Sequence, residues 1–560
     1  MHRTDRRNGV DPRISDAGNS ESRTLRLMHE MSAIPFDEQL EACAIDPLTK
    51  VAAEAAPRKR TYGQILKSSA IVGGSTVLNV GIGIVRTKAM ALLLGPGGFG
   101  LAGLYTSVIT LTQSIAGMGV NSSGVRQIAE AAGSKDEERI ARTTVVLRRT
   151  SVLLGLLGAV ALVVFSKQVA TVTFGNAQRW GAVCLISLAV LFQLVSAGQG
   201  ALIQGMRRIA DLAKMNVIGA LSGMVISIPV VYVLRERGIA VSLVLVAATT
   251  IVTSWWYSRK IRIKPPALNA VQTWHETRGL LKLGVAFMAS GLMVPGVAYF
   301  VRVFLLQQVG MAATGMYQSA WTLGGLYVGF ILQAMGADFF PRLSAVASDN
   351  AECNRLVNEQ ALIGLLLAGP GIIATLTFAP AVIALFYSSK FGPAVGVLRW
   401  ICLGAMLQVV SWPMGFIIIA KAKQNLFVLS ESLWTVVAVG LNWVCIRFYG
   451  LNGAGIAFFA SYVFHSFLTY GLVFHLSGYR WSSENRRIGL VFLVAIGLIF
   501  CSCYLLNPIA GLCLGIVGVL LSTAYSLHQL LQLLDDNRVT RPIRQIAARF
   551  GLATSCGDAR

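Results

Sequence analysis

Charged residues are scarce in this chain of 560 residues, since Asp, Glu, Lys and Arg together make up only 13% of it. Soluble globular proteins carry about 25%, so this chain has too little charge to cover several water-facing domains. Apolar residues make up 54%. These fractions exclude an ordinary cytosolic enzyme, a secreted disulfide-rich protein and a disordered protein. They predict an all-α polytopic membrane protein.

The sequence also lacks the spacings of familiar catalytic and metal sites. It has nine cysteines but no C-x-x-C and no Cys/His ligand pattern, so we interpret the cysteines as buried thiols. It contains no P-loop and no Ser/His/Asp or Cys/His arrangement. We therefore expect no metal, no cofactor and no catalytic residue, and we do not expect an enzyme.

Fourteen apolar segments have about the 20 residues that a bilayer-crossing helix needs. They are 68–94, 99–120, 148–166, 180–203, 213–234, 238–257, 280–309, 314–336, 361–387, 395–419, 426–446, 450–476, 488–506 and 508–534. The short segment G-P-G-G-F-G at 95–100 lies between the first two. It matches G-x-G-x-x-G, but no strand precedes it, and we predict a tight hairpin rather than a nucleotide site.

The net charge of +22 is explained by topology. If the N-terminus is inside, the inside loops carry 22 Lys and Arg and the outside loops carry 7. This bias predicts that both termini are cytoplasmic, and it makes a nucleic-acid partner unnecessary. The outside loops are too short to form an extracellular domain.

The first six spans resemble the next six at a nearly constant offset along the sequence. Gly95 matches Gly310, and Gly238-Ile239-Ala240 matches Gly455-Ile456-Ala457. Six is an even number, so the two halves have the same orientation, which is a transporter architecture with its site between the repeats. The predicted parts are a disordered cytoplasmic tail (1–62), an N-lobe (63–257), a cytoplasmic linker (258–279), a C-lobe (280–476), two additional spans (477–534) and a cytoplasmic C-terminal tail (535–560).

Three cations lie inside predicted spans, namely Arg86, Lys88 and Arg302. A charge at the bilayer centre costs about 2.5–3.5 kcal/mol on insertion scales, so such residues should face a wet cavity and find an anion. The repeat places Arg86 opposite position 301 or 302. The alternative is that all three side chains extend to the outer headgroups.

The first, second and seventh spans contain no Asp or Glu, so a cavity lined by these arginines favours an anionic substrate. Guanidinium suits phosphate because its planar donors bind two oxygens at once. Amide and aromatic groups in the spans, among them Asn79, Gln113 and Tyr317, are candidates for sugar contacts. Packing between helices is the competing explanation for each of them.

Two stretches carry a resemblance to a known family. They are R-T-K-A-M-A-L-L-L-G-P-G-G-F-G-L-A-G-L-Y at 86–105 and I-A-G-M-G-V-N-S-S-G-V-R-Q-I-A-E at 115–130. The sequence here resembles Wzx-type O-antigen translocases of the multidrug/oligosaccharidyl-lipid/polysaccharide exporter superfamily. The resemblance runs from about 63 to 476. It implies a MATE-like bundle of two six-helix lobes with alternating access, to which this chain adds two C-terminal helices.

The resemblance also implies a function in the bacterial inner membrane. The chain would move undecaprenyl-diphosphate-linked oligosaccharide to the outer leaflet, with Arg86 and Arg302 in position to bind the diphosphate. From the residues themselves, Lys88, Asn79, Gln113 and Tyr317 are the other candidates for substrate binding. Its partners would be this lipid-linked substrate, membrane lipid and the polysaccharide polymerase machinery. Two alternatives stay open: a cation-coupled multidrug exporter of the same superfamily, and a membrane-embedded glycan polymerase or ligase.

Overall fold

The computed structural model describes residues 47–134, 136–261 and 270–533, and among these it contains helices and no strand. The chain divides into two units, 1–71 and 72–560. The predicted disordered tail lies outside the described residues up to 46. From Pro47 to residue 62 the chain is helical instead, because Ala, Leu, Lys, Arg and Glu dominate this stretch and all favour helix. The predicted C-terminal tail lies outside the described residues.

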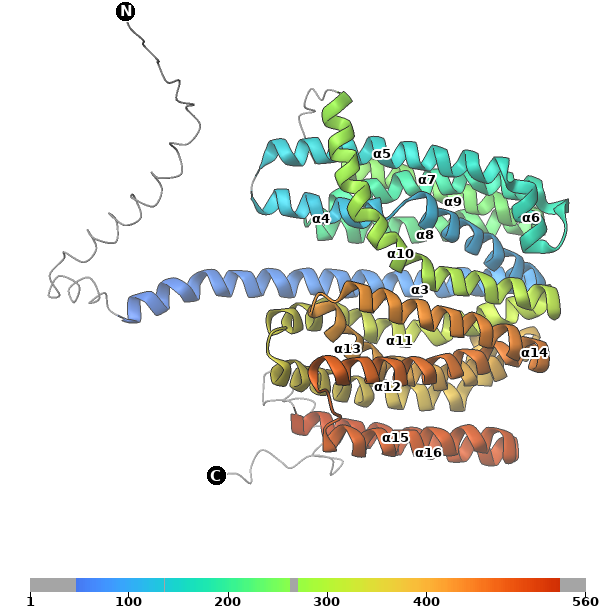
Figure 1. The fold of residues 1–560 in the computed structure, drawn as a ribbon. Coiled ribbons are helices and arrows are strands. Elements are labelled where there is room, and N and C mark those ends of the chain that lie inside the picture. The colour runs from blue at the N-terminus through green and yellow to red at the C-terminus, as the bar shows by residue number, and fades with distance from the viewer. Residues whose placement is uncertain (1–46, 135, 262–269, 534–560) are drawn as a thin grey trace, which may run out of the picture. The chain divides into compact units, whose positions relative to one another are not determined.

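Sequence-adjacent helices build the first half of the second unit (Figure 1). The helices α5, α7, α8 and α9 pack against one another, and α4 covers α5 and α7. A buried apolar cluster containing Leu104, Ile186 and Ile239 forms the core of this lobe. The elements are α3 (Pro47–Ala116), α4 (Val120–Gly133), α5 (Glu137–Val164), α6 (Ser166–Phe174), η1 (Ala177–Arg179), α7 (Trp180–Gly205), α8 (Ile209–Leu234), η2 (Arg235–Arg237) and α9 (Gly238–Ser258).

The second half repeats this arrangement with α11, α12, α13 and α14 in mutual contact. Its apolar core is larger and includes Leu376, Leu398 and Phe391. The elements are α10 (Ala270–Gln308), α11 (Met311–Ala345), α12 (Asn350–Phe386), η3 (Ser389–Phe391), α13 (Ala394–Ala420), α14 (Gln424–Ser477), α15 (Ser483–Leu505) and α16 (Pro508–Leu533).

The helix α10 packs on both halves. It contacts α4, α5 and α6 as well as α11 and α14. Tyr299 and Val303 belong to the core of the first lobe, whereas Val301 and Leu305 belong to the core of the second. Residues four apart share a helix face, and residues two apart do not. The two sides of this one helix therefore tie the lobes together.

Ten helices in the described part of the chain are long and apolar enough to cross a membrane. Three of them, Gly74–Ala116, Ile209–Ser258 and Gln424–Ser477, have 43, 50 and 54 residues, and each covers two predicted spans. One crossing needs about 20 residues. Every predicted span lies on a helix apart from a few residues at its ends, although α11 is not among the ten. The polytopic helical fold is confirmed, and the count of fourteen crossings stays a prediction.

The internal repeat is visible in the backbone. Three breaks between helices use residues with positive φ, and each break recurs in the second half at one and the same offset. The pairs are Gly95 and Gly310 (φ 62° and 114°), Arg207 and Ala422 (54° and 55°), and Arg235 and Gly450 (52° and 56°). Because a positive φ is uncommon outside glycine, three coincidences at one spacing indicate a common ancestral fold for the two lobes. The break at Gly95 is the hairpin that the sequence predicts.

The two helices outside the repeat, α15 and α16, lie side by side and pack on α12 (Figure 1). A buried amide pair fixes the start of α15. The Nδ2 of Asn485 donates to the backbone oxygen of Asn358 at 2.8 Å and to its Oδ1 at 2.9 Å. The Ser482 amide donates to the same Oδ1 at 2.9 Å. These bonds attach the additional helix pair to the second lobe.

The backbone of Arg235 has a conformation that its counterpart in the second lobe, Gly450, adopts without strain. Both residues have ψ −131° with φ above 50°. Such a backbone costs a residue with a Cβ about 1–3 kcal/mol. We therefore predict that Arg235→Gly stabilises the protein by roughly 1 kcal/mol, after about 0.5–1 kcal/mol is subtracted for the greater freedom of glycine in the unfolded chain. Thermal unfolding in detergent measures this.

The matched control is Arg237→Gly, because Arg237 has an ordinary φ of −64° and loses the same charge. An equal rise in unfolding temperature for both variants would mean that charge removal, and not strain, is responsible.

Candidate functional site

A cavity of about 1110 Å³ opens among the described helices. Five helices line it: α3, α10, α11, α13 and both segments of α14. Most of its wall belongs to the second lobe, and α3 contributes Thr76, Val77 and Val80. A volume of roughly 300–1,000 Å³ is typical of sites for small ligands, so this cavity is large enough for a ligand of several rings.

One stripe of α14 faces the cavity. Glu431, Trp434, Ala438 and Asn442 line it and follow one another at spacings of three and four residues, which places them on one side of a helix. At 1.5 Å per residue the stripe from Glu431 to Asn442 extends about 16 Å. The cavity wall therefore changes from carboxylate to indole to amide along a single helix.

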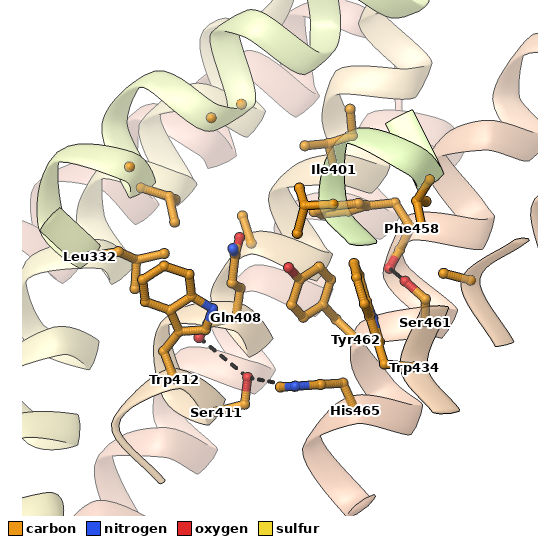
Figure 2. Close-up of a pocket in the computed structure, with 18 of the residues that line it drawn as sticks. Leu332, Ile401, Gln408, Ser411, Trp412, Trp434, Phe458, Ser461, Tyr462 and His465 are labelled. Atoms are coloured by element: carbon orange, nitrogen blue, oxygen red, sulfur yellow. Dashed lines mark hydrogen bonds between the residues drawn. The ribbon is translucent and has the colours of Figure 1, made fainter. Parts of the chain in front are cut away.

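A carboxylate and a histidine meet in this cavity. Glu431 Oε1 lies 3.6 Å from His465 Nε2, and His465 Nδ1 lies 3.3 Å from the hydroxyl of Ser411. Figure 2 shows the contact between Ser411 and His465. The Glu431 side chain is 23% exposed and that of His465 is 9% exposed. Among the described lining residues there is no lysine or arginine, so the cavity wall is neutral to acidic.

Aromatic rings make up much of the remaining wall. Trp434 and Tyr462 have ring centroids 5.8 Å apart, and Tyr462 and Phe458 are 4.9 Å apart. Trp321 contacts Phe458 edge-on at 5.5 Å. Figure 2 shows the rings of Trp434, Tyr462 and Trp412 around one space. Such rings give a rigid, flat surface against which a cyclic ligand can pack.

Two buried polar atoms of the wall have no hydrogen-bond partner within the described part of the protein, the indole Nε1 of Trp434 and the amide Oδ1 of Asn442. The two residues are 7% and 3% exposed. An unsatisfied buried donor or acceptor costs about 1–3 kcal/mol. One donor and one acceptor without partners in a cavity wall indicate a place where a ligand with hydroxyl or amide groups can bind.

Two of the predicted substrate-binding residues, Tyr317 and Arg302, are in contact in the structure. The Arg302 guanidinium lies 5.8 Å from the centre of the Tyr317 ring. Its Nε donates to Gln318 Oε1 at 2.7 Å and its Nη1 to the Ala298 carbonyl at 2.6 Å. Tyr317 lines the large cavity, but Arg302 is 6% exposed and lies behind it. Both acceptors of Arg302 are neutral, so its charge has no counterion among the described residues.

Arg86 lies apart from this pair, on the side of the first lobe. Its guanidinium is next to Gly223 of α8, and it is half-buried. No hydrogen bond or ion pair joins it to another described residue. Asn79, two turns earlier on α3, has a buried Oδ1 that lacks a partner among the described residues. The predicted roles of both in substrate binding stay predictions.

Lys88 makes a contact that the sequence did not predict. Its ammonium donates to the carbonyl oxygens of Ala384 at 3.0 Å and Leu385 at 2.6 Å. These are carbonyls of the last turn of α12, where a cation is favoured by the helix dipole. The bond joins α3 of the first lobe to α12 of the second.

Gln113 contacts neither arginine. Its Nε2 donates to Gln193 Oε1 at 2.5 Å, and it lines a second cavity of about 250 Å³ among α3, α4, α5, α7 and α10. Of the six predicted site residues, only Arg302 and Tyr317 are therefore in contact with each other among the described residues. The other four lie at separate places in the structure.

Sequence reasoning did not select Glu431, His465, Trp434, Tyr462 and Asn442. Each was visible only as a single polar or aromatic residue in a span. The available signal was the helical spacing from Glu431 through Trp434 to Asn442. Such a stripe has the same spacing whether it faces a cavity or another helix, so the spacing alone could not place it.

The lobes touch closely at the end that carries Gly95 and Gly310, here called the Gly95 end, which the charge bias predicts to be outside. A Cβ on Gly315 would collide with the Pro96 carbonyl oxygen, and one on Gly100 would collide with the Met311 carbonyl. The Phe99 ring contacts Tyr387 at 5.4 Å and Phe391 at 5.9 Å. The lobes are therefore in contact at this end.

The hydrogen bonds of Lys88 to α12 are among the contacts that hold the lobes together near the Gly95 end. We predict that Lys88→Met increases the open population about two- to thirtyfold, because a cation at a helix C-terminus contributes roughly 0.5–2 kcal/mol. Spin labels at Leu92 of the first lobe and Lys390 of the second report the separation of the lobes. The Lys88→Arg variant keeps a donor and should resemble the wild type. An unchanged distance distribution in Lys88→Met would refute this role.

The fold is a polytopic helical bundle with two repeated lobes, and comparison with solved structures agrees. The chain matches a lipid II flippase, MurJ, in an inward closed conformation, with a TM-score of 0.60 and 13% identity over 83% of this chain and 100% of that one. It matches an inward-facing MATE-family multidrug resistance transporter of the MOP superfamily with a TM-score of 0.58 and 16% identity, covering 74% of this chain and 98% of that one.

The sequence comparison defines the family more closely. A family described as "Polysaccharide biosynthesis protein" matches residues 89–396. A lipid III flippase of Escherichia coli (strain K12) is 24% identical over 413 residues, which are 73% of this chain and 98% of that protein. The chain belongs to the polysaccharide biosynthesis protein family, a membrane family with the fold of the MOP superfamily, as the resemblance in the sequence predicted.

Proposed function

We propose that the chain is a flippase that moves a lipid-linked oligosaccharide from the inner to the outer leaflet of the bacterial cytoplasmic membrane. The observation that carries this proposal is the similarity to a lipid III flippase over 98% of that protein's length, together with the family match. The named relatives are transporters rather than enzymes. An undecaprenyl-diphosphate carrier and an O-antigen or related surface polysaccharide unit are the finer parts of this proposal.

The mechanism that fits is alternating access. Two lobes with the same fold are in contact at the Gly95 end, and a cavity opens in the second lobe with part of its wall from α3. Rocking them apart at that end would expose the cavity wall to the other side while the lipid tail stays in the bilayer. The driving force would be a cation gradient or the membrane potential, because the sequence has no nucleotide-binding motif.

Arg86 and Arg302 are the proposed ligands of the diphosphate. Neither forms an ion pair with a described carboxylate, so each can accept an anionic partner without breaking a salt bridge. Removing one charge-assisted hydrogen bond between a guanidinium and a phosphate weakens the binding free energy by about 1.5–3 kcal/mol. We therefore predict that Arg86→Ala and Arg302→Ala each lower the flipping rate at least tenfold.

The assay reconstitutes each variant in vesicles and measures the appearance of lipid-linked glycan in the outer leaflet. Arg302→Lys controls for folding, because it keeps the charge of this buried side chain and removes the planar fork of donors that can bind two phosphate oxygens at once. Arg447→Ala removes an exposed arginine and should flip normally. Wild-type rates in both alanine variants would remove the arginines from the mechanism, and failure of the wild-type chain to restore surface polysaccharide in a translocase-deficient strain would contradict the function itself.

The proposed setting is a multi-pass protein of the inner membrane with both termini in the cytoplasm. The cation bias of the predicted loops supports this orientation. Contact with the polysaccharide polymerase machinery is part of the same proposal, and α15 and α16 are the surfaces available for it, because they lie outside the repeat.

A second candidate function is cation-coupled drug export, and one observation favours it: a carboxylate, Glu431, lies in an aromatic cavity, which suits a cationic drug. In that case, deleting the gene should increase sensitivity to cationic dyes, and Glu431→Gln should do the same. We expect instead that drug sensitivity stays unchanged while surface polysaccharide is lost.

A further inference from the structure

The large cavity differs in chemistry from the arginine positions. Its described wall has one carboxylate, one histidine, several aromatic rings and no Lys or Arg. A phosphate would find no cation there, and Glu431 would repel it. An uncharged ligand with ring faces and hydroxyl groups fits the wall better, because rings pack on Trp434 and Tyr462 while hydroxyls can bond to Glu431.

We propose that this cavity of the second lobe is a binding subsite for uncharged sugar rings, separate from the diphosphate position. The juxtaposition of the faces of Trp434 and Tyr462 with the carboxylate of Glu431, the indole Nε1 of Trp434 and the Oδ1 of Asn442 provides the recognition. The inference rests on the proposed function for the source of the sugar, which is the oligosaccharide of the lipid-linked cargo.

The unpartnered atoms are the strongest argument. Trp434 Nε1 is a donor and Asn442 Oδ1 is an acceptor, and a sugar hydroxyl or acetamido group can satisfy either. Each is buried in the wall of the cavity, and neither finds a partner among the described residues. Glu431 can accept hydrogen bonds with two carboxylate oxygens, and Oε1 lies 3.6 Å from His465 Nε2. These groups are spread over several turns of α14, which is room for more than one ring.

Comparison of the two repeats shows that the indole and the carboxylate of this cavity occur in the second lobe and not at the equivalent positions of the first. The breaks at 207 and 422 and at 235 and 450 fix a single offset for the helix between them. At this offset Trp434 corresponds to Gly219 and Glu431 corresponds to Asn216. The first lobe has the same backbone breaks without the indole and the carboxylate. Neither residue is thus needed for the backbone fold that the lobes share.

A histidine lies beside the carboxylate of this subsite. His465 lies between Glu431 of its own helix and Ser411 of α13, with contacts of 3.6 Å and 3.3 Å. The contact with Ser411 connects α14 to α13. Its ring also contacts the rings of Trp434 and Tyr462, at centroid distances of 6.2 Å and 5.8 Å.

The test is direct sugar binding to the purified full-length protein in nanodiscs, measured by saturation-transfer NMR from protein to ligand protons. The probes are N-acetylglucosamine, galactose and mannose as uncharged sugars and glucuronic acid and glucosamine as charged ones, with inorganic pyrophosphate added as a competitor. We expect saturable transfer to at least one uncharged sugar, with weaker transfer to glucuronic acid. Binding of that sugar should be unaffected by a saturating concentration of pyrophosphate.

Two conservative substitutions then locate the site. Trp434→Phe keeps a ring and removes the donor, and Glu431→Gln keeps the size and removes the charge. Each should weaken sugar binding about tenfold, the effect of losing one well-placed hydrogen bond to a buried group. The matched control is Trp443→Phe on the same helix, since Trp443 is 53% exposed and does not line the cavity. This control should bind like the wild type.

Three results would overturn the subsite: no transfer to any uncharged sugar, transfer that is equal in Trp434→Phe, Glu431→Gln and wild type, or transfer to glucosamine alone, which would assign the cavity to cationic ligands. A purely structural role for the two residues would lower the unfolding temperature and leave sugar affinity unchanged. The proposed function fails separately, if sugar binds as expected but lipid-linked glycan is not flipped by the wild-type protein.

Discussion

A polar group in the centre of a bilayer has no water to bond with, so it must find its partner in the protein or in a ligand. Most such groups here find it in the protein. Lys88 donates to the last carbonyls of α12, and Arg302 donates to Gln318 and to a carbonyl of its own helix. Trp434 Nε1 and Asn442 Oδ1 do not, at least among the described residues. Both residues line the large cavity, where a ligand can supply the missing hydrogen-bond partner.

The repeat explains why one lobe holds the large cavity. Both lobes place their breaks at matching positions, and the break that needs a positive φ uses Gly450 in one and Arg235 in the other. The backbone geometry was therefore kept even where the residue opposed it. The side chains that line the cavities differ: aromatic rings, a carboxylate and a histidine line the cavity of about 1110 Å³, whereas glutamine, small residues and aliphatic side chains such as Leu154 and Leu194 line the one of about 250 Å³.

Much of the fold could be predicted from the sequence, because apolar length is a strong signal and Gly95 and Gly310 mark the breaks. The helical segment after Pro47 was missed, since polarity was given more weight than helix propensity. The site was harder. Arg302 and Tyr317 were candidates for separate reasons, a charge within a span and a polar ring within a span, and only the structure shows that they are in contact. Lys88 was expected to contact substrate or headgroups, and only the three-dimensional position of α12 shows its carbonyl partners. The cavity itself depends on the packing of five helices.

The burial of Arg302 has a consequence for transport if the arginines bind the diphosphate. In the conformation described here, with the lobes in contact at the Gly95 end, its guanidinium is 6% exposed and bonded to Gln318, and Gln318 also lies against Gly103 of the first lobe. Suppose that an anion binds the guanidinium more tightly when Gln318 has moved away, with the lobes apart, than when the lobes are in contact. Binding of that anion would then shift the equilibrium toward separated lobes. Sugar rings held against Trp434 need no such movement. A cargo with an anionic end and an uncharged end could thus be recognised first by its sugars and then promote opening through its phosphates.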